Sequence, residues 1–490
     1  MKILLVYPRT PDTFWSFKHA MPFISKRAAF PPLGLLTIAA MMPVDWQLKL
    51  IDLNVRPLSD DDLRWADYVM LSGMIVHRTS ALEIAERCRR FAKPVIAGGP
   101  LFTTGHADFS TIKHFVLGEA EALMPQLIRD ILHGELRDTY TAVGRPDITG
   151  VPVPRWDLIN FKDYAAMAVQ FSRGCPFDCE FCDIIVMNGR VPRTKSPTQL
   201  LAELEQLRLR GWQDTVFVVD DNFIGKKKQA KELLRALVEW RARTSAKMSF
   251  LTEASANLAD DPELYSLMVR AGFRKVFVGI ETPSVESLEE CRKVQNCHRD
   301  LVETVKTLQR AGLEVMGGFI VGFDNDKLDI FKRQFEFIQS SGVVAAMVGL
   351  LTALPQTRLY HRLLKEGRLE TESTGNNTDA VLNFRPKLDR EVLINGYREL
   401  MKELYAPRNY YQRIRTFLEE HRPSGPRFRL SMTELKAFVK SLWFLGIVEP
   451  DRLTYWRFFV TTLLRRPRQF CRAMELTILG YHFRRVASGL

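Results

Sequence analysis

Short apolar runs alternate with helical periodicity throughout the first 150 residues. The runs are rich in Leu, Ile and Val and end in Gly, Asp or Ser, which is typical of buried strands. Strand–helix alternation predicts a doubly wound parallel sheet, which binds ligands at the carboxyl ends of its strands. The expected strands are Lys2–Tyr7, Gln47–Leu53, Tyr68–Ser72, Pro94–Gly98 and His114–Leu117, and the expected helices are Leu33–Met42, Ala81–Phe91 and Ala120–His133.

A second alternating stretch runs from about residue 167 to residue 355. Six strand–helix units of this size favour a partial (β/α)6 barrel, related to the eight-unit barrel. Beyond it only helical patterns occur, at Leu388–Leu404, Tyr411–Glu420 and Ser431–Leu445 and through the C-terminus. The expected barrel strands are Ala168–Arg173, Thr215–Asp220, Ser249–Glu253, Val276–Glu281, Glu314–Val321 and Ala345–Leu351.

Length and composition agree with this division into domains. The chain has 490 residues, 46% hydrophobic and 26% charged, which is the profile of a globular protein of about three domains. We therefore expect an α/β fold with a Rossmann-like domain at residues 1–145 and a Pro-rich linker at 146–165. The partial barrel would occupy residues 166–360, and a mainly helical domain would occupy 361–490.

The charge is concentrated at one end of the chain. Formal net charge is +12, and residues 401–490 hold 17 Lys and Arg against 7 Asp and Glu, a balance of +10. The first 400 residues are therefore almost neutral, and any basic contact surface belongs to the C-terminal part.

Cysteine usage and the N-terminus both indicate a cytoplasmic protein. Seven cysteines are too few, and odd in number, for a disulfide framework. The first eight residues have one charge and no small-residue cleavage site, so they predict a strand rather than a secretory signal. The longest apolar stretch, Phe30–Pro43, contains prolines and is too short to span a bilayer.

Three cysteines form the strongest motif in the sequence. Cys175, Cys179 and Cys182 have the spacing C-x3-C-x2-C directly after a predicted strand. Three thiolates from one loop can bind three irons of a cubane cluster and leave the fourth iron open to another ligand. A zinc site is the alternative, but it usually needs four ligands in paired spacing, and the only nearby candidates are Cys291, Cys297 and His298.

This spacing, with Phe181 before the last cysteine, resembles the radical S-adenosylmethionine superfamily. The resemblance implies a 4Fe–4S cluster whose open iron chelates S-adenosylmethionine and cleaves it to a 5′-deoxyadenosyl radical. It also implies that the ends of the following barrel strands hold S-adenosylmethionine. On the second and third strands these residues are Asp220, Asp221, Asn222, Glu253 and Ser255, and on the next two they are Gly279, Glu281, Gly318, Ile320 and Gly322.

The N-terminal region resembles the cobalamin-binding domain that precedes the barrel in one branch of this superfamily. The resemblance rests on Phe30–Leu35, Ile96–Pro100 and Leu117–Glu121. It implies that cobalamin contacts Pro32, Gly34, Ser72, Met74, Val76, His77, Gly98, Gly99, Pro100, Gly118 and Glu119.

Cobalamin is expected in a base-off form, because no Asp-x-His-x-x-Gly motif occurs in the chain. His77 is the candidate ligand for the lower face of cobalt, although a hydrogen-bonding role is the more frequent one for such a histidine. If Met74 or Val76 lies there instead, cobalt stays poorly ligated, which favours methyl transfer.

One subgroup is more similar still. The segments Asp220–Gly225, Gly279–Pro283 and Leu350–Thr357 resemble the hopanoid C-2 methylases and their relatives. This resemblance implies transfer of a methyl group from methylcobalamin to an unactivated carbon, best matched by a hydrophobic polycyclic lipid. It also implies a low-potential electron donor such as flavodoxin or ferredoxin.

Three other functions remain open. The same cofactors could serve methylation of a peptide carbon or a tetrapyrrole, or a radical cyclisation without methyl transfer. A cobalamin-binding sensor that is not an enzyme is the third alternative.

The C-terminal segments Tyr455–Val460 and Leu463–Phe470 interleave aromatic residues with arginines. This composition suits peripheral contact with the inner face of a membrane or, equally, packing on the barrel with a solvated basic face. Nucleic-acid binding is the least favoured alternative, and no nucleic-acid partner is expected.

Overall fold

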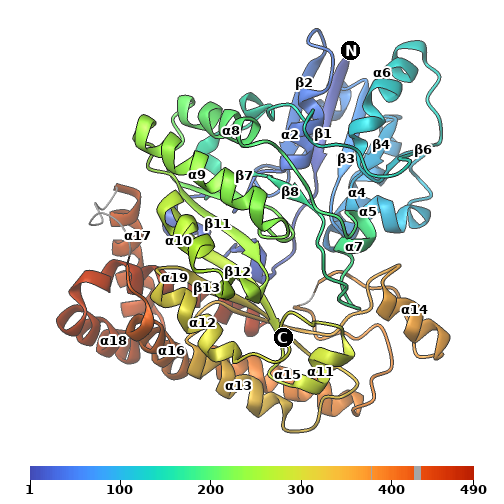
Figure 1. Ribbon diagram of the computed structural model, residues 1–490. Coiled ribbons are helices and arrows are strands. Elements are labelled where there is room, and N and C mark those ends of the chain that lie inside the picture. The colour runs from blue at the N-terminus through green and yellow to red at the C-terminus, as the bar shows by residue number, and fades with distance from the viewer. Residues whose placement is uncertain (377, 424–431) are drawn as a thin grey trace.

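The computed structural model describes residues 1–376, 378–423 and 432–490. It has an N-terminal parallel sheet, a second parallel sheet that curves as a partial barrel, and a C-terminal layer of helices packed on that barrel (Figure 1). The predicted α/β class is therefore confirmed.

The N-terminal sheet has the strand order β2-β1-β3-β4-β5-β6, with every pair parallel. From β1 the chain adds β2 on one side and then β3 to β6 on the other, so the order of strands reverses between β1 and β3. A doubly wound sheet binds its ligand at the carboxyl ends of the strands at such a point. Its strands are β1 Lys2–Tyr7, β2 Gln47–Asp52, β3 Tyr68–Ser72, β4 Val95–Gly98, β5 His114–Leu117 and β6 Thr139–Thr141. Its helices are α1 Met21–Ile24, α2 Leu33–Ala40, α3 Asp60–Trp65, α4 Arg78–Arg90, α5 Pro100–Gly105 and α6 Met124–His133.

The second sheet follows the chain order, β7-β10-β11-β12-β13-β14, and all its strands are parallel. Its strands are β7 Met167–Val169, β10 Thr215–Val218, β11 Ser249–Ala254, β12 Phe273–Glu281, β13 Glu314–Val321 and β14 Ala346–Leu350. The helices between them are α8 Pro197–Leu209, α9 Lys227–Thr244, α10 Pro262–Ala271, α11 Val285–Glu290, α12 Leu301–Arg310 and α13 Ile330–Ser341.

One predicted barrel strand, Ala168–Arg173, is divided in two. After β7 the chain leaves the sheet, and β8 Ser172–Arg173 pairs antiparallel with β9 Arg193–Thr194. The division occurs because the buried Asp220 carboxylate accepts hydrogen bonds from the Phe171 amide and the Ser172 hydroxyl. The short helix α7, Ile184–Met187, lies between β8 and β9 and follows the last cysteine of the loop.

The C-terminal helices share one continuous hydrophobic core with the barrel. They are α14 Arg358–Lys365, α15 Arg390–Tyr405, α16 Pro407–Glu420, α17 Met432–Trp443, α18 Arg452–Arg465 and α19 Phe470–Ala487. A π-helical turn, Phe444–Val448, joins α17 to α18. The Tyr397 hydroxyl donates to the Val348 carbonyl at 3.1 Å, which fixes α15 on the last barrel strand. The first residue of the predicted helix Ser431–Leu445 lies outside the described residues.

The two ends of the chain meet. A segment of residues 14–31 leaves the N-terminal sheet and reaches the last helix, α19. His482 on α19 places its Nε2 atom 3.1 Å from the Phe14 carbonyl oxygen, and the rings of Phe14 and Phe483 are 5.4 Å apart. On the other side of the same segment, Trp15 stacks on Phe217 of the barrel at 5.9 Å.

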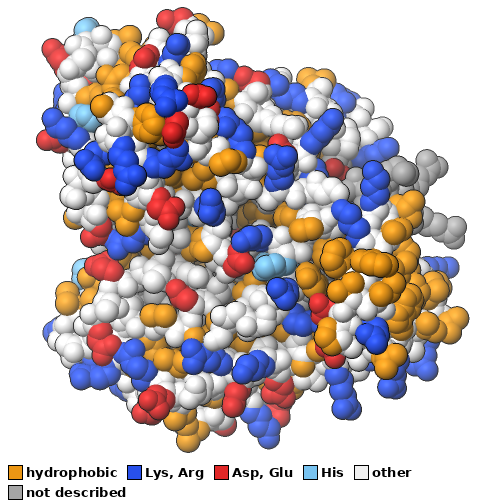
Figure 2. Space-filling model, turned by 180° about the vertical axis from the view of Figure 1, so that it is seen from behind, with side chains coloured by type: hydrophobic (Ala, Val, Ile, Leu, Met, Phe, Trp, Pro, Cys, Tyr) orange, Lys and Arg blue, Asp and Glu red, His pale blue; other side chains and the backbone are white. Residues whose placement is uncertain are grey.

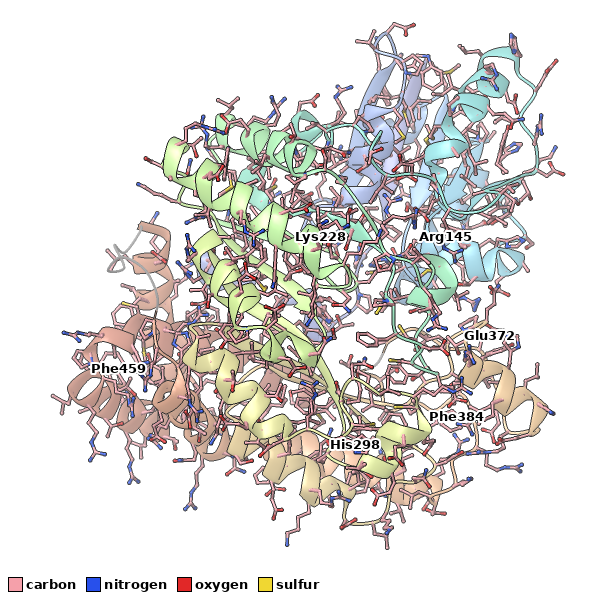
Figure 3. All side chains as sticks on the ribbon, in the orientation of Figure 1. Arg145, Lys228, His298, Glu372, Phe384 and Phe459 are labelled. Carbon is pink, nitrogen blue, oxygen red and sulfur yellow. The ribbon has the colours of Figure 1, made fainter. Side chains whose placement is uncertain are left out.

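The connector between the two sheets is packed against them. Trp156 and Tyr164 are buried, and the Tyr164 hydroxyl lies 3.1 Å from the carboxylate of Asp52 at the end of β2. Arg145 reaches α7 and donates to the Val186 carbonyl at 2.7 Å (Figure 3). Both contacts fix the position of the N-terminal sheet relative to the cysteine loop.

Candidate cofactor and active site

A cavity of about 1170 Å³ lies between the carboxyl ends of the two sheets. The carboxyl ends of β1, β3, β4 and β5 form one side, and barrel residues after β7, β10 and β11 form the other. Among the residues predicted to bind cofactors, those that line it are Gly34, Ser72, Met74, Val76, Gly98, Gly99, Pro100, Gly118, Glu119, Asp221 and Glu253.

The cysteine loop is held by the acidic motif at the end of β10. Asp220 binds the Phe171 amide at 2.7 Å and the Ser172 hydroxyl at 2.6 Å, and Asp221 accepts from the Gly174 amide at 2.9 Å. Burial raises the pKa of Asp220 to about 7. Both carboxylates therefore hold the loop in place, and contact of Asp220 with S-adenosylmethionine stays a prediction.

Hydrogen-bond donors approach two of the three sulfurs. Asn222 Nδ2 lies 3.7 Å from the Cys175 Sγ, and Gln295 Nε2 lies 3.7 Å from the Cys179 Sγ. Such donors stabilise thiolates and tune the iron that the thiolates bind. Sequence reasoning missed Gln295, because it lies in a loop far from the cysteine motif in the chain.

A buried ion pair lies beside the loop. Lys293 Nζ is 2.6 Å from Glu281 Oε1. Burial opposes the Lys293 charge, but Glu281 and the nearby Cys179 raise its pKa above the ordinary value. A Cβ on Gly279 would lie only 2.5 Å from Glu281 Oε1, so this glycine leaves room for the ion pair. Glu281, predicted to bind S-adenosylmethionine, is paired with a lysine that the motif analysis did not identify.

The cysteines fit a cluster better than a single ion. Across the described ranges 1–376, 378–423 and 432–490, no three His, Cys, Asp or Glu side chains converge closely enough to hold one metal ion. All three loop cysteines are free thiols, and a cubane cluster separates its thiolates more widely than one zinc ion does. The donors to sulfur and the Lys293 cation also suit an anionic set of thiolates.

Glu253 is a carboxyl group that remains available to a ligand. It lies one residue before the end of β11 and lines the cavity, and no hydrogen bond or ion pair to its carboxyl group is found among the described residues. Burial, together with the charges of Asp221 and Asp220, raises its pKa to about 8. A cationic or hydroxyl-rich ligand would satisfy this group, which is what the ammonium and ribose groups of S-adenosylmethionine provide.

The two halves of the cavity are joined by partly buried charges. Arg173, just before the cysteine loop, donates to Glu119 at 2.7 Å and to Glu121 at 2.6 Å. Arg193 donates to the other oxygen of Glu119 at 2.6 Å. Glu119 borders the cavity and its carboxylate pairs with these arginines, which links the two domains, and its contact with cobalamin stays a prediction.

His77 is buried and both of its ring nitrogens are engaged. Nδ1 accepts from the Met74 amide at 3.0 Å, and Nε2 lies 3.1 Å from the Thr10 hydroxyl. Burial lowers the pKa of His77 to about 4. The imidazole is therefore neutral and has no free nitrogen for cobalt, whereas Met74, Ile75 and Val76 line the cavity.

Glycines and apolar side chains, together with polar ones such as Arg9 and Asn54, line the N-terminal half of the cavity. Gly99 has φ +90°, and a Cβ there would lie 2.5 Å from the Ser72 hydroxyl. Gly34, by contrast, faces open space, since no atom lies within 4 Å of a Cβ built on it. Such surfaces allow a large flat ligand to approach the main chain closely.

The other predicted residues lie outside the cavity lining. Ser255 is hydrogen-bonded to Asn222 at 3.2 Å, and a Cβ on Gly318 would lie 2.8 Å from the Phe277 ring. Phe181 packs against Phe323, and the Gly322 amide donates to Asp326 at 2.8 Å. These residues shape the loop and the strand ends and do not border the cavity, and the same holds for Pro32, Gly279 and Ile320.

Several apolar lining residues were not predicted. Trp15, Phe30 and Phe217 form an aromatic wall, and Leu354 lines the cavity from the region after the barrel. No local motif marks them, because they come from three distant segments that meet only in the folded chain.

Comparison with known proteins gives two family matches. Residues 169–338 match the Radical SAM superfamily, and residues 357–490 match a domain of unknown function (DUF4070). The second match covers the helices that follow the barrel.

Two curated relatives align with almost the entire chain. An uncharacterized methyltransferase from Synechocystis sp. is 41% identical, over 99% of this chain and 91% of its own length. Hopanoid C-2 methylase from Rhodopseudomonas palustris is 35% identical, over 95% of this chain and 90% of its own length.

The fold also has a solved counterpart. The structure of the radical S-adenosylmethionine methyltransferase TsrM from Kitasatospora setae, with cobalamin and a [4Fe-4S] cluster bound, superposes with a TM-score of 0.64. It covers 100% of this chain and 99% of its own, at 14% sequence identity, so the likeness is one of fold.

Proposed function

The chain belongs to the cobalamin-dependent radical S-adenosylmethionine methyltransferases, the family that includes hopanoid C-2 methylase, and we propose that it methylates a hydrophobic polycyclic lipid of the hopanoid type. It is a methyltransferase whose cofactors are a 4Fe–4S cluster, S-adenosylmethionine and cobalamin. The methyl acceptor, its carbon atom and the electron donor belong to the proposal.

The residues that line the cavity and the cysteine loop beside it have distinct tasks in this reaction. When bound, the cluster and S-adenosylmethionine supply a radical that removes a hydrogen atom, and cobalamin supplies the methyl group. Cys175, Cys179 and Cys182 would hold the cluster, and Asp221 keeps their loop in place through the Gly174 amide. Glu253 would bind the polar groups of S-adenosylmethionine on the same side of the cavity.

The N-terminal half orients cobalamin by shape. Gly34 and Gly118 give it access to backbone, and Met74 and Val76 form the apolar surface that would face cobalt. Both ring nitrogens of His77 already have partners, so this histidine would not be available to cobalt and apolar side chains would line that side of bound cobalamin.

The aromatic wall is the observation that supports an apolar acceptor. Trp15, Phe30 and Phe217 line the cavity where the two halves meet, and they exclude water from the space in which the radical forms. A rigid hydrocarbon needs such a surface and few polar contacts, because its apolar area supplies the binding energy. The 35% identical hopanoid C-2 methylase makes a pentacyclic triterpenoid the first substrate to test.

The test is an anaerobic assay with purified, reconstituted protein, a low-potential reductant such as reduced flavodoxin, and S-adenosylmethionine. Three acceptors are compared: a pentacyclic triterpenoid, a magnesium-free tetrapyrrole and a peptide mixture. We expect a CH₂ mass gain only on the triterpenoid, together with 5′-deoxyadenosine and S-adenosylhomocysteine.

The other outcomes separate the alternatives. Methylation of the tetrapyrrole or peptide without the lipid would refute the proposed acceptor. Deoxyadenosine without methylation would indicate a radical cyclisation, and neither nucleoside with any acceptor would indicate a sensor. The variant Cys179→Ala is the blank, because it removes one cluster ligand.

A further inference from the structure

We propose that the outer surface of α17, the π turn and α18 binds an anionic lipid bilayer. Large apolar side chains gather there on the outside of the molecule, and Figure 2 shows them as a dense patch over the C-terminal helices. We call this surface the apolar face and define it by Trp443, Ile447, Val448, Leu453, Leu463 and Leu464.

The apolar face is not the packing side of these helices. Leu453 is 80% exposed and Leu464 is 76% exposed, whereas Tyr455 and Phe458 on the same helix are buried. Phe458 stacks on Tyr411 of α16 at 4.9 Å, so α18 already has its contacts with the protein interior. Isolated exposed leucines are ordinary on protein surfaces, but a continuous group of this kind marks an interaction site.

The structure also changes which residues of the tail would touch a membrane. The arginine-interleaved aromatics Tyr455, Phe458, Phe459 and Phe470 pack against one another and against neighbouring helices. Phe459, labelled in Figure 3, lies 4.9 Å from the Phe470 ring. The exposed apolar residues are instead mostly aliphatic, and the amino-acid composition of the tail did not show which of its apolar residues are exposed.

Charge favours an anionic partner. Lys436, Arg452, Arg457, Arg465 and Arg468 are exposed on these helices and their junctions, and none has an ion-pair partner within the described part of the chain. Between α17 and α18, the acidic side chains Glu449 and Asp451 face Arg484 at 3.2 and 3.8 Å. Uncompensated cations around an apolar centre match phosphate headgroups around an acyl region.

The geometry suits a surface that lies on the bilayer. Within the described residues, no helix is both long enough and apolar enough to cross a membrane. The Trp456 indole donates to the Gly446 carbonyl at 2.8 Å, which fixes the angle between the π turn and α18. Leu453 and Leu464 are therefore held on a rigid support, and they can enter the lipid without reordering the helices.

A second copy of the chain and a nucleic acid fit less well. A two-fold contact would bring the same unpaired arginines toward one another, and like charges oppose such an interface. Nucleic acid would use the arginines but would leave the leucines and Trp443 in water.

The apolar face is connected to the cavity through the segment of residues 14–31. Phe23 on α1 packs against Phe444 of the π turn at 5.5 Å, and Lys440 on α17 donates to the Pro22 carbonyl at 2.6 Å. On either side of α1, Trp15 and Phe30 line the cavity. The same segment thus supports the face and forms the aromatic wall, so this inference rests on the proposed lipid acceptor and adds the surface from which the lipid is taken.

The test is sedimentation of the intact, cofactor-loaded protein with vesicles. Vesicles of phosphatidylcholine alone are compared with vesicles that contain phosphatidylglycerol. We expect the wild type to bind mainly to the anionic vesicles. Its affinity for them should fall at least tenfold in the double variant Leu453→Ser/Leu464→Ser. It should also fall in Arg457→Gln/Arg468→Gln, and the difference between that variant and the wild type should shrink as salt is added. The matched control is Leu132→Ser/Val143→Ser, which removes exposed apolar side chains from the N-terminal domain.

Two results would overturn the inference. One is vesicle binding that the Leu453→Ser/Leu464→Ser variant keeps, and the other is a dimer, seen by light scattering, that this variant dissolves. Methylation of a detergent-dispersed triterpenoid is measured in parallel, and we expect it to be unchanged in the variant. Loss of vesicle binding with retained methylation would show that the apolar face binds the membrane and is not needed for the reaction itself. Failure of methylation in the wild type and in every variant would refute the proposed function and leave the membrane-binding inference to the vesicle assay.

Discussion

The two halves of the cavity differ in the kinds of residue that form them. On the barrel side, buried acids, amides and a lysine surround the cysteine loop, and Asp220, Asp221 and Lys293 each have a hydrogen-bond or ion-pair partner. On the N-terminal side, glycines and apolar side chains line the cavity together with polar ones such as Arg9, Lys18 and Arg27, and the buried histidine His77 has its hydrogen-bond partners within its own domain. The barrel side is therefore organised around the cysteine loop, whereas the N-terminal side offers glycines and apolar side chains to a ligand.

The acidic residues show the difference most clearly. Asp220 and Asp221 accept hydrogen bonds from the cysteine loop, whereas the carboxyl group of Glu253, on the adjacent strand, lines the cavity. Three acids at neighbouring strand ends therefore have two functions, although they look alike in the sequence.

The largest expected effect is on the barrel side. Cys179→Ala removes a cluster ligand and should reduce bound iron and sulfide, and all cleavage of S-adenosylmethionine, to background. Cys88→Ala, a buried thiol of the N-terminal domain, should keep both. Iron analysis and quantification of 5′-deoxyadenosine measure the effect, and retention of a full cluster by Cys179→Ala would contradict the site.

The link between the halves should give the next largest effect. Arg173→Met leaves Glu121 buried without its partner, and we expect a loss of about 3 kcal/mol in the free energy of unfolding. Arg155→Met removes a half-exposed pair with Asp157 and should cost less than about 1 kcal/mol. Urea denaturation measures both, and equal losses would show that the interdomain charges are not coupled to folding.

Glu253 gives the barrel side a pH signature. Its folded pKa, about 8, is above the ordinary value of 4.5, so the folded state binds the proton more tightly than the unfolded state. Stability from this group is thus present below about pH 4.5 and lost as pH rises through 8. Glu253→Gln removes that loss, and the cofactor-free variant should exceed the wild type in stability at pH 8.5 but match it at pH 4.5.

A surface acid provides the control for this pH dependence. Glu263, with Lys231 and Arg235 as partners, has a lowered pKa, so Glu263→Gln should slightly destabilise the protein at pH 8.5. Thermal unfolding at both pH values measures the pair. A stability gain in both variants would mean that the Glu253 carboxyl is not specially placed.

The smallest effect is predicted on the N-terminal side. Gly34→Ala adds a methyl group that meets no protein atom within 4 Å, and within α2 it should stabilise the fold by about 0.5–1 kcal/mol. The same methyl group points into space that cobalamin would use, so cobalamin affinity should fall while stability rises. Cobalamin titration measures the affinity, and thermal unfolding measures the stability. If affinity and stability rose together or fell together, Gly34 would not be a place where the fold leaves room for cobalamin.

The sequence predicted those elements whose signal is local. The buried strands β1, β3, β5 and β13 have the bounds expected, because each is a continuous apolar run. The edge strand β6, Thr139–Thr141, was missed, since only its middle residue is buried and it has no apolar run.

Within the site, the cysteine loop was predicted because its three ligands lie within eight residues. Gln295, Lys293 and the aromatic wall were not, because their contacts depend on how distant segments meet. The tail shows the same limit, since composition identified its basic residues but could not tell that Tyr455 and Phe458 are buried while Leu453 and Leu464 are exposed.

The contact between Phe14 and His482 joins positions 468 residues apart. At about 5–20 residues per second, the ribosome needs roughly 25–90 s to make the chain between them. For that time the segment of residues 14–31 lacks its final partner, and one wall of the cavity stays open. The aromatic wall, to which this segment contributes Trp15 and Phe30, is therefore completed only after the last helix has been made, and a C-terminal truncation that removes α19 should leave the segment without this support.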